Sequence, residues 1–109
     1  MEIIKLLFIQ KYRIKSMSKK PKVAPGDWIT FGSSRLPKSA VVCMVYDDPS
    51  LGDIEVVYLD DRNRAINEDM VWQDDKWEFK TSGPCGGYAD QYDRLEHYVR
   101  ILRRGRYTK

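Results

Sequence analysis

The side chains in this chain that could do chemistry are mostly carboxylates, and they come in adjacent pairs. Oxygen ligands of this kind can hold a hard cation. No pair has the Asp-x-Asp-x-Asp-Gly spacing that places ligands around one ion, whereas acidic residues are common in turns and on soluble surfaces. We therefore predict turns, with a docking surface for a basic partner as the alternative, at Asp47-Asp48, Asp60-Asp61, Glu68-Asp69 and Asp74-Asp75.

One acidic pair lies in a pattern that resembles an enzyme signature. The tetrad Tyr58-Leu59-Asp60-Asp61 is similar to the YxDD motif of reverse transcriptases, whose neighbouring carboxylates hold catalytic metals. Such a site also needs a third carboxylate on a neighbouring strand and a much larger domain. A chain of 109 residues has no room for that domain, so we predict a hairpin turn.

The nucleophiles and soft metal ligands are few. The two cysteines, Cys43 and Cys85, lack CxxC spacing, and with His97 they are too few for a zinc site. A disulfide between them is geometrically feasible, but two reduced thiols in a cytoplasmic protein are the favoured interpretation. His97 follows Glu96 and suggests a solvated side chain rather than a general base. We expect no catalytic residue, metal, cofactor or enzymatic activity.

Aromatic residues are candidates for a binding patch. Rings that surround one pocket can hold a cation through cation–π attraction. The simpler interpretation is that the same rings fill the core of a small barrel. The candidates are Tyr46, Tyr58, Trp72 and Trp77, and Trp28 could join them.

Charge divides the chain into three parts. Residues 1–26 carry a net charge of +6, residues 27–93 carry −8 and residues 94–109 carry +5, for a total of +3. The last part suits phosphate groups through Arg100, Arg103, Arg104 and Arg106, with Tyr107 and Lys109 nearby. The alternative is a basic helix that packs on its own acidic domain.

We do not expect the first segment to be a membrane span or a signal peptide. Its apolar run LLFI is short, Lys5 interrupts the segment, and no small-residue cleavage site follows. A basic amphipathic helix and an upstream extension before Met17 remain alternative interpretations. Residues 1–24 are predicted to be a basic extension and linker, because Pro21 and Pro25 interrupt a polar run.

The middle of the chain predicts short strands joined by tight turns. A three-residue turn at 61–63 would place Asn63 in the left-handed conformation and set Tyr58 opposite Ile66. A turn centred on Asp74-Asp75, with either two or four residues in its loop, would set Trp72 opposite Trp77. The strands are expected at Asp27–Phe31, Ala40–Tyr46 (covered on both sides), Ile54–Leu59, Met70–Gln73 and Lys76–Lys80, with loops at 32–38 and 47–53.

A single helix should follow a Gly-rich connector at 81–87. We place it from about Gln91 to Arg103, capped by Asp90 and ended by Gly105. The apolar stripe that should dock on the sheet consists of Leu95, Tyr98, Val99 and Leu102.

Five short strands and one helix predict a mainly β (α+β) domain, a small barrel. PGDWITF, the valine-rich second strand, VVYLDDRNRAI and WEF together resemble the SH3-like barrels, and among them the Tudor and KOW types. The resemblance covers residues 25–80, and residues 81–109 form the connector and helix. Tudor domains hold methylated lysine or arginine in an aromatic cage, so the resemblance implies such a patch here.

Two functional hypotheses follow. The first is a non-enzymatic module whose acidic barrel presents a groove or sheet edge to a protein or peptide. The second is a nucleic-acid-associated protein whose basic helix and tail contact phosphates.

Overall fold

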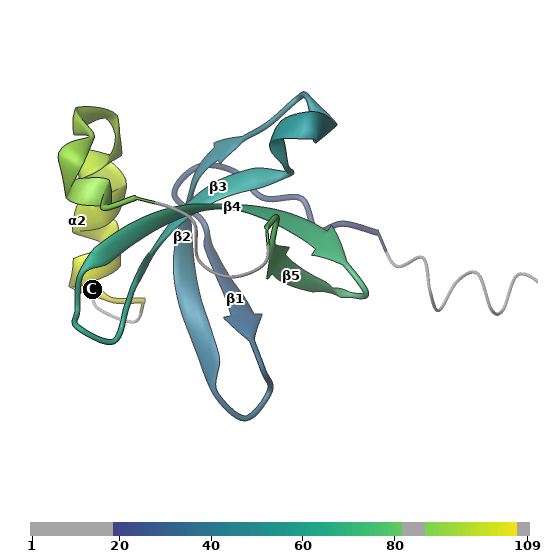
Figure 1. Ribbon diagram of the computed structural model, residues 1–109, viewed down its shortest axis with the longest axis horizontal. Helices are drawn as coiled ribbons and strands as arrows, with labels where there is room; N and C mark the ends of the chain where they lie inside the picture. The colour runs from purple at the N-terminus through teal and green to yellow at the C-terminus, as the bar shows by residue number, and fades with distance from the viewer. Residues whose placement is uncertain (1–18, 82–86, 107–109) are drawn as a thin grey trace, which may run out of the picture.

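The computed structural model describes residues 19–81 and 87–106, which form one closed barrel and a C-terminal helix (Figure 1). The predicted architecture, a small SH3-like five-stranded barrel followed by one helix, is confirmed. Its strands are β1 (Trp28–Gly32), β2 (Pro37–Val45), β3 (Ile54–Leu59), β4 (Ala65–Gln73) and β5 (Lys76–Phe79). The helical elements are η1 (Pro49–Leu51), η2 (Ala89–Gln91), η3 (Asp93–Leu95) and α2 (Glu96–Arg104).

The sheet closes at one narrow seam. Each strand pairs with the next in antiparallel register, and β1 then pairs in parallel with β5. That last pairing joins a single pair of residues, Phe31 and Trp77, whereas β3 and β4 are paired along six positions from Ile54↔Met70 to Leu59↔Ala65. The seam between β1 and β5 is therefore the shortest junction of the barrel.

The barrel interior is filled by alternate residues of the strands. Side chains of a strand point to opposite faces in turn, and β3 directs Ile54, Val56 and Tyr58 inward. The other strands complete this interior cluster with Ile29, Phe31, Ala40, Val42, Ile66, Met70 and Trp77.

The opposite faces of β2 and β3 form a second core with the helix. Val41 and Val57 are fully buried there, under Leu95, Val99 and Leu102 of the η3–α2 segment. The predicted docking of the apolar stripe is confirmed, with Tyr98 packed at its margin. In Figure 1, α2 stands on the side of the barrel away from β5.

The two predicted hairpins are confirmed. Asn63 has φ 63°, and Tyr58 pairs with Ile66. Trp72 pairs with Trp77 around a two-residue loop. That loop holds Asp74 and Asp75 in the left-handed region, at φ 57° and 64°, as a type I′ turn requires.

Two strand boundaries and the burial of one strand were predicted wrongly. Strand β2 begins at Pro37 inside the expected loop, because Pro37 faces Gly32 at the hairpin end, where a missing N–H is tolerated. Strand β4 continues through residues 67–69, which pair with β3 even though they are polar. Met44 and Val45 are about two-fifths exposed, so β2 is covered on both sides only in its middle.

The helix also begins later than expected. Two short 3-10 turns occupy residues 89–95, and α2 starts at Glu96 without a side-chain cap. Asp90 is therefore not its N-cap. The turns allow the chain to reach over β4, where Tyr88 forms an isolated bridge with Ile66.

The described residues contain no helix that is long and apolar enough to cross a membrane. The predictions for residues 1–16, for Cys85 and for Tyr107 and Lys109 concern positions outside the described residues.

Candidate functional site: an aromatic pocket beside two polar grooves

The four candidate aromatic residues do not form one patch. Tyr58 and Trp77 line the same pocket. Trp72 packs edge-on against Trp77, with 5.2 Å between ring centroids, but does not line that pocket. Tyr46 faces a different groove and donates a hydrogen bond to Asp69 (2.6 Å). Trp28 packs against the second core, which lies between the helix and the outer faces of β2 and β3 and is called the outer core below.

The pocket that holds Tyr58 and Trp77 has aromatic walls. The rings of Phe31, Tyr58 and Phe79 contact one another with centroid separations of 5.3, 5.5 and 5.8 Å. The cavity has a volume of about 600 Å³ and opens to solvent across the β1–β5 seam. The three rings come from three strands that the closed sheet brings together at this end.

Two of these walls were missed by sequence reasoning. Phe79 alternates with Trp77 along β5, so a shared face could have been inferred from the two-residue period. Phe31 could not be recognised as a pocket residue because its neighbour Trp77 lies across the seam between the first and last strands. A pairing between the first and last strands leaves no local pattern in the chain.

The rim of the pocket is charged, whereas its floor is apolar. Lys76 forms an ion pair with Glu78 at 3.4 Å, and Lys38 lines the pocket from β2. The Ser33 hydroxyl is engaged in its own hairpin, where it accepts a hydrogen bond from the Leu36 amide (3.0 Å). The charged groups that line the cavity are thus two ammonium groups and one carboxylate.

Tyr58, which lines the pocket, carries a hydroxyl group and is only 4% exposed. Burial, followed by the negative charges of Glu68 and Asp60, raises the pKa of Tyr58 to about 12. Within the described part of the chain this hydroxyl makes no hydrogen bond. It is therefore a neutral hydroxyl on a residue that lines a mostly apolar cavity.

A second groove surrounds a buried carboxylate. Glu55 is only 3% exposed, and Arg94 donates to both of its oxygens at 2.6 and 2.9 Å. Asn67 adds a third hydrogen bond at 3.2 Å. The hydrogen bond to Glu55 raises the pKa of Arg94 further above its ordinary value. The hydrogen bonds from Arg94 connect the segment before α2 to β3. The contacts in this groove therefore hold the protein's own elements together.

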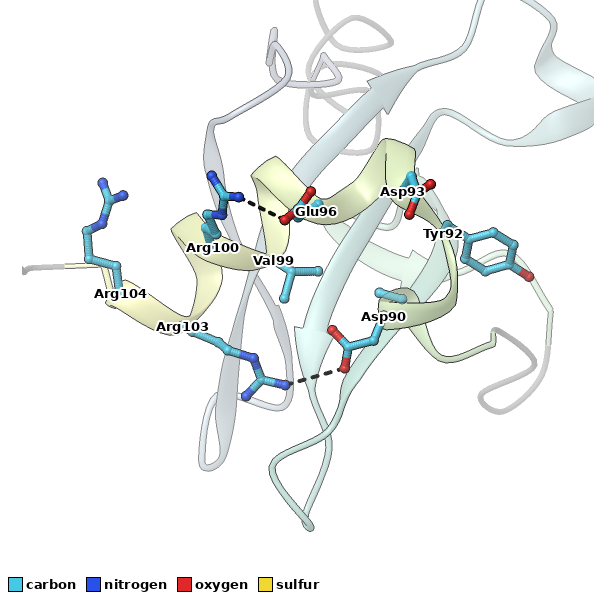
Figure 2. Close-up of a pocket in the computed structure, with 9 residues that line it drawn as sticks. Asp90, Tyr92, Asp93, Glu96, Val99, Arg100, Arg103 and Arg104 are labelled. Atoms are coloured by element: carbon cyan, nitrogen blue, oxygen red, sulfur yellow. Dashed lines mark hydrogen bonds and ion pairs between the residues drawn. The ribbon is translucent and has the colours of Figure 1, made fainter.

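Three of the four candidate phosphate contacts, Arg100, Arg103 and Arg104, line a third groove, on the helix side (Figure 2), whereas Arg106 borders a different hollow. Arg100 binds Glu96 at 2.8 Å and Arg103 lies 3.7 Å from Asp90. Arg103 also donates to the Asn63 carbonyl (3.3 Å).

Of the remaining arginines, Arg106 donates to the Thr30 hydroxyl at 3.0 Å. Only Arg104 extends away without a contact in the described chain, as Figure 2 shows. Three of the four arginines already have partners within the protein.

Potential metal ligands do not cluster in the described ranges. No group of three or more His, Cys, Asp or Glu side chains there could hold a metal ion. Cys43 is a buried free thiol, and burial raises its pKa to about 12, away from reactive thiolate character. His97 packs edge-on against Tyr98 at 5.1 Å.

Comparison with protein-family models, with curated proteins and with solved structures finds no match to this chain. The fold and the pocket therefore define a class only: a small closed β-barrel with a helical cover and an aromatic pocket at its seam. The finer likeness to Tudor and KOW barrels stays a prediction.

Proposed function

We propose that this chain is a non-enzymatic binding module that recognises a peptide segment of a protein partner at the aromatic pocket. The observation that carries the proposal is the pocket itself, in which Phe31, Tyr58 and Phe79 form an apolar, solvent-open cavity of about 600 Å³. Concave apolar sites with a few polar groups at the edge are the usual form of ligand sites.

The closure of the sheet favours side-chain recognition over strand addition. A peptide that adds a strand needs a row of unpaired main-chain groups at a sheet edge. The five strands are paired in a ring, and β2, the longest candidate edge in the sequence, lies between β1 and β3. Unpaired edge remains in β1 and β5 on either side of their single residue pair, but both strands are short. A partner would therefore insert side chains into the pocket rather than extend the sheet. The first hypothesis allowed binding either in a groove or at a sheet edge. We retain binding in a groove and no longer propose binding at a sheet edge.

The alternative, phosphate binding by the helix, has weaker support. Arg100, Arg103 and Arg106 each contact a group of the protein. The groove that holds Arg100 and Arg103 is also lined by Asp90, Asp93 and Glu96. A polyanion would have to compete with these contacts and approach three carboxylates. Because exposed ion pairs are weak, a polyanion could still displace them. A measurement of nucleic-acid binding at two salt concentrations therefore tests this alternative.

The test of the proposal is a selection of displayed random peptides on the full chain, with counter-selection on a pocket variant. Phe79→Ala removes one wall and replaces a side chain that is already partly exposed. We expect a family of peptides that bind the wild type and bind Phe79→Ala at least about tenfold more weakly, as the loss of an aromatic contact at a binding centre predicts.

A matched variant on the other side of the barrel controls for nonspecific effects. Tyr92→Ala also removes a partly exposed ring, but it lies in the helix-side groove. The selected peptides should bind this variant as they bind the wild type. A selection that yields no peptide sensitive to Phe79→Ala, when both variants keep a folded spectrum, would overturn the proposal.

A cytoplasmic location belongs to the same proposal and is tested by cell fractionation.

A further inference from the structure

The charges around the aromatic pocket differ from those of the barrel as a whole. Residues 27–93 carry a net charge of −8, which suggests a cationic ligand. The charged residues that line the pocket itself are Lys38, Lys76 and Glu78, which give +1. Short-range charge at a site decides which ligand group enters it, because charge farther away is screened by solvent.

The two lysines of the rim are not equivalent. Lys76 is neutralised by Glu78 at 3.4 Å. Lys38 makes no ion pair within the described chain, although Asp61 lines a neighbouring hollow that Lys38 also borders. The uncompensated charge at the mouth of the pocket is therefore the Lys38 ammonium.

The strand pattern directs Lys38 toward the pocket. Lys38 has the same parity along β2 as Ala40 and Val42, which point into the barrel. It also lies directly opposite Phe31 in the β1–β2 register. Its apolar stem can lie against the ring while its ammonium group stays in water at the rim.

The acidic groups nearest the floor are already engaged. Asp60 accepts hydrogen bonds from the Arg64 amide (2.9 Å) and from Arg64 Nε (3.0 Å), and these contacts lower the pKa of Asp60. Glu68 is only 5% exposed and has an interaction of its own. Neither lines the cavity, so neither can pair directly with a ligand in it.

We propose that the pocket accepts an uncharged aliphatic or aromatic side chain of a peptide, with a neighbouring peptide carboxylate paired to Lys38. This inference rests on the proposed function and narrows it to one class of ligand. A cationic side chain, including a methylated lysine, is disfavoured because its charge would lie beside the Lys38 ammonium.

The experiment compares two blocked peptides, Gly-X-Asp, that differ in one atom. In one peptide X is trimethyl-lysine, and in the other the quaternary nitrogen is replaced by carbon. The side chains then have the same shape and differ in charge alone. Binding is measured by NMR titration of the full chain, followed at the amides of Trp77 and Phe79. We expect the neutral peptide to bind at least about threefold more tightly, the scale of an exposed charge interaction.

Variants test the role of Lys38. Lys38→Glu should reverse the preference between the two peptides, whereas Lys22→Glu, an exposed lysine that does not line the pocket, should leave it unchanged. Replacement of the peptide aspartate by asparagine should weaken binding to the wild type and not to Lys38→Glu.

The outcomes separate this inference from the proposed function. Tighter binding of the trimethyl-lysine peptide to the wild type would overturn the inference and leave the peptide-binding module intact. The same holds for a preference that Lys38→Glu does not alter. A lack of any peptide sensitive to Phe79→Ala in the selection would remove the proposed function, and the inference with it.

Discussion

Two apolar cores lie back to back on β2 and β3, and they are closed by different means. Val56 points into the barrel and its neighbour Val57 points toward α2, and both are fully buried. The inner core contains aromatic rings and is enclosed by five hydrogen-bonded strands. The fully enclosed members of the outer core are aliphatic and small side chains under the η3–α2 segment, and aromatic rings pack only at its margin.

The difference shows how a small barrel gains a second layer. A sheet of five short strands encloses little apolar volume, and the added segment buries the reverse faces of the same strands. Its position depends on a charged contact, because Arg94 holds the buried carboxylate of Glu55 on β3. The inner core is thus specified by strand pairing and the outer core by packing plus one ion pair.

The largest effects should come from truncation of either core. Ile54 and Leu95 are 1% and 0% exposed, one on each side of β3. We expect Ile54→Ala and Leu95→Ala each to lower the free energy of unfolding by about 3 kcal/mol, the usual cost of a cavity in place of a large aliphatic side chain. Urea denaturation followed by tryptophan fluorescence measures both.

The same variants test whether the two cores unfold together. We expect one transition, because the cores share β2 and β3. Hydrogen exchange at the amides of α2 should therefore respond to urea at the same concentration as the strands. Loss of helix protection well before the fluorescence change in Leu95→Ala would show that the outer layer detaches independently.

The next effect should come from the ion pair that holds the outer layer. Arg94→Ala leaves the Glu55 carboxylate, 4% exposed in its side chain, without its main partner. Because the Arg94 side chain is itself about half exposed, we expect a loss of about 2 kcal/mol rather than the full cost of an unpaired buried charge.

Arg100→Ala is the matched control for Arg94→Ala. It also removes an arginine from a carboxylate, but both partners of the Arg100–Glu96 pair are 66% exposed. Its cost should be below about 0.5 kcal/mol. Equal losses in the two variants would contradict the view that Glu55–Arg94 locks the segment to the barrel.

Alkaline pH should distinguish the cores by the groups that each one buries. Burial raises the pKa of Cys43 in the outer core from 9.0 to about 12, and that of Tyr58 in the inner core from 10.0 to about 12. The folded state holds these protons longer than the unfolded state does. The stability they contribute is therefore present below their ordinary pKa values and is lost as pH rises toward the folded values.

Cys43→Ala should flatten this loss, beginning above about pH 9, by up to about 1.4 kcal/mol per pH unit for the one proton. Tyr58→Phe should flatten it only from about one unit higher. Urea midpoints measured at a series of pH values check both, each variant compared with its own value at neutral pH. A slope in Cys43→Ala equal to that of the wild type would contradict the assignment.

The smallest effect is a gain at the β4–β5 turn. Asp74 and Asp75 both have positive φ, where glycine is favoured over residues with a Cβ. Asp75→Gly should raise the free energy of unfolding by about 0.5 kcal/mol and keep Trp72 opposite Trp77. Thermal unfolding measures the gain, and a lower midpoint would show that the Asp75 side chain makes contacts worth more than the strain.

Local patterns in the sequence were sufficient for the fold. Alternation marked the strands, Asn63 and the Asp74-Asp75 pair marked the hairpins, and the stripe from Leu95 to Leu102 marked the docked face. Each signal depends on residues a few positions apart, which share a face or a turn. The helix start failed because the 3-10 turns at 89–95 are set by contacts with β4.

The candidate site was only half predictable. Tyr58 and Trp77 were named, and Phe79 shares a strand face with Trp77 by the two-residue period, but Phe31 reaches the pocket only through barrel closure. Tyr46 looked equivalent to Tyr58 and was directed elsewhere, because the strand register shifts between Val42 and Met44. The partners of Arg103 and Arg106 lie 40 and 76 positions away in the chain. No spacing rule reaches that far.

The seam between β1 and β5 gives the pocket a second property. Phe31 and Trp77 are the one residue pair that joins these strands, and both line the cavity. A ligand side chain in the pocket would contact β1 and β5 at once and so hold together the shortest junction of the barrel. Ligand binding would then raise the free energy of unfolding, by about 2.7 kcal/mol at a ligand concentration one hundred times Kd. Thermal-shift measurements alone could therefore report which ligands the pocket accepts.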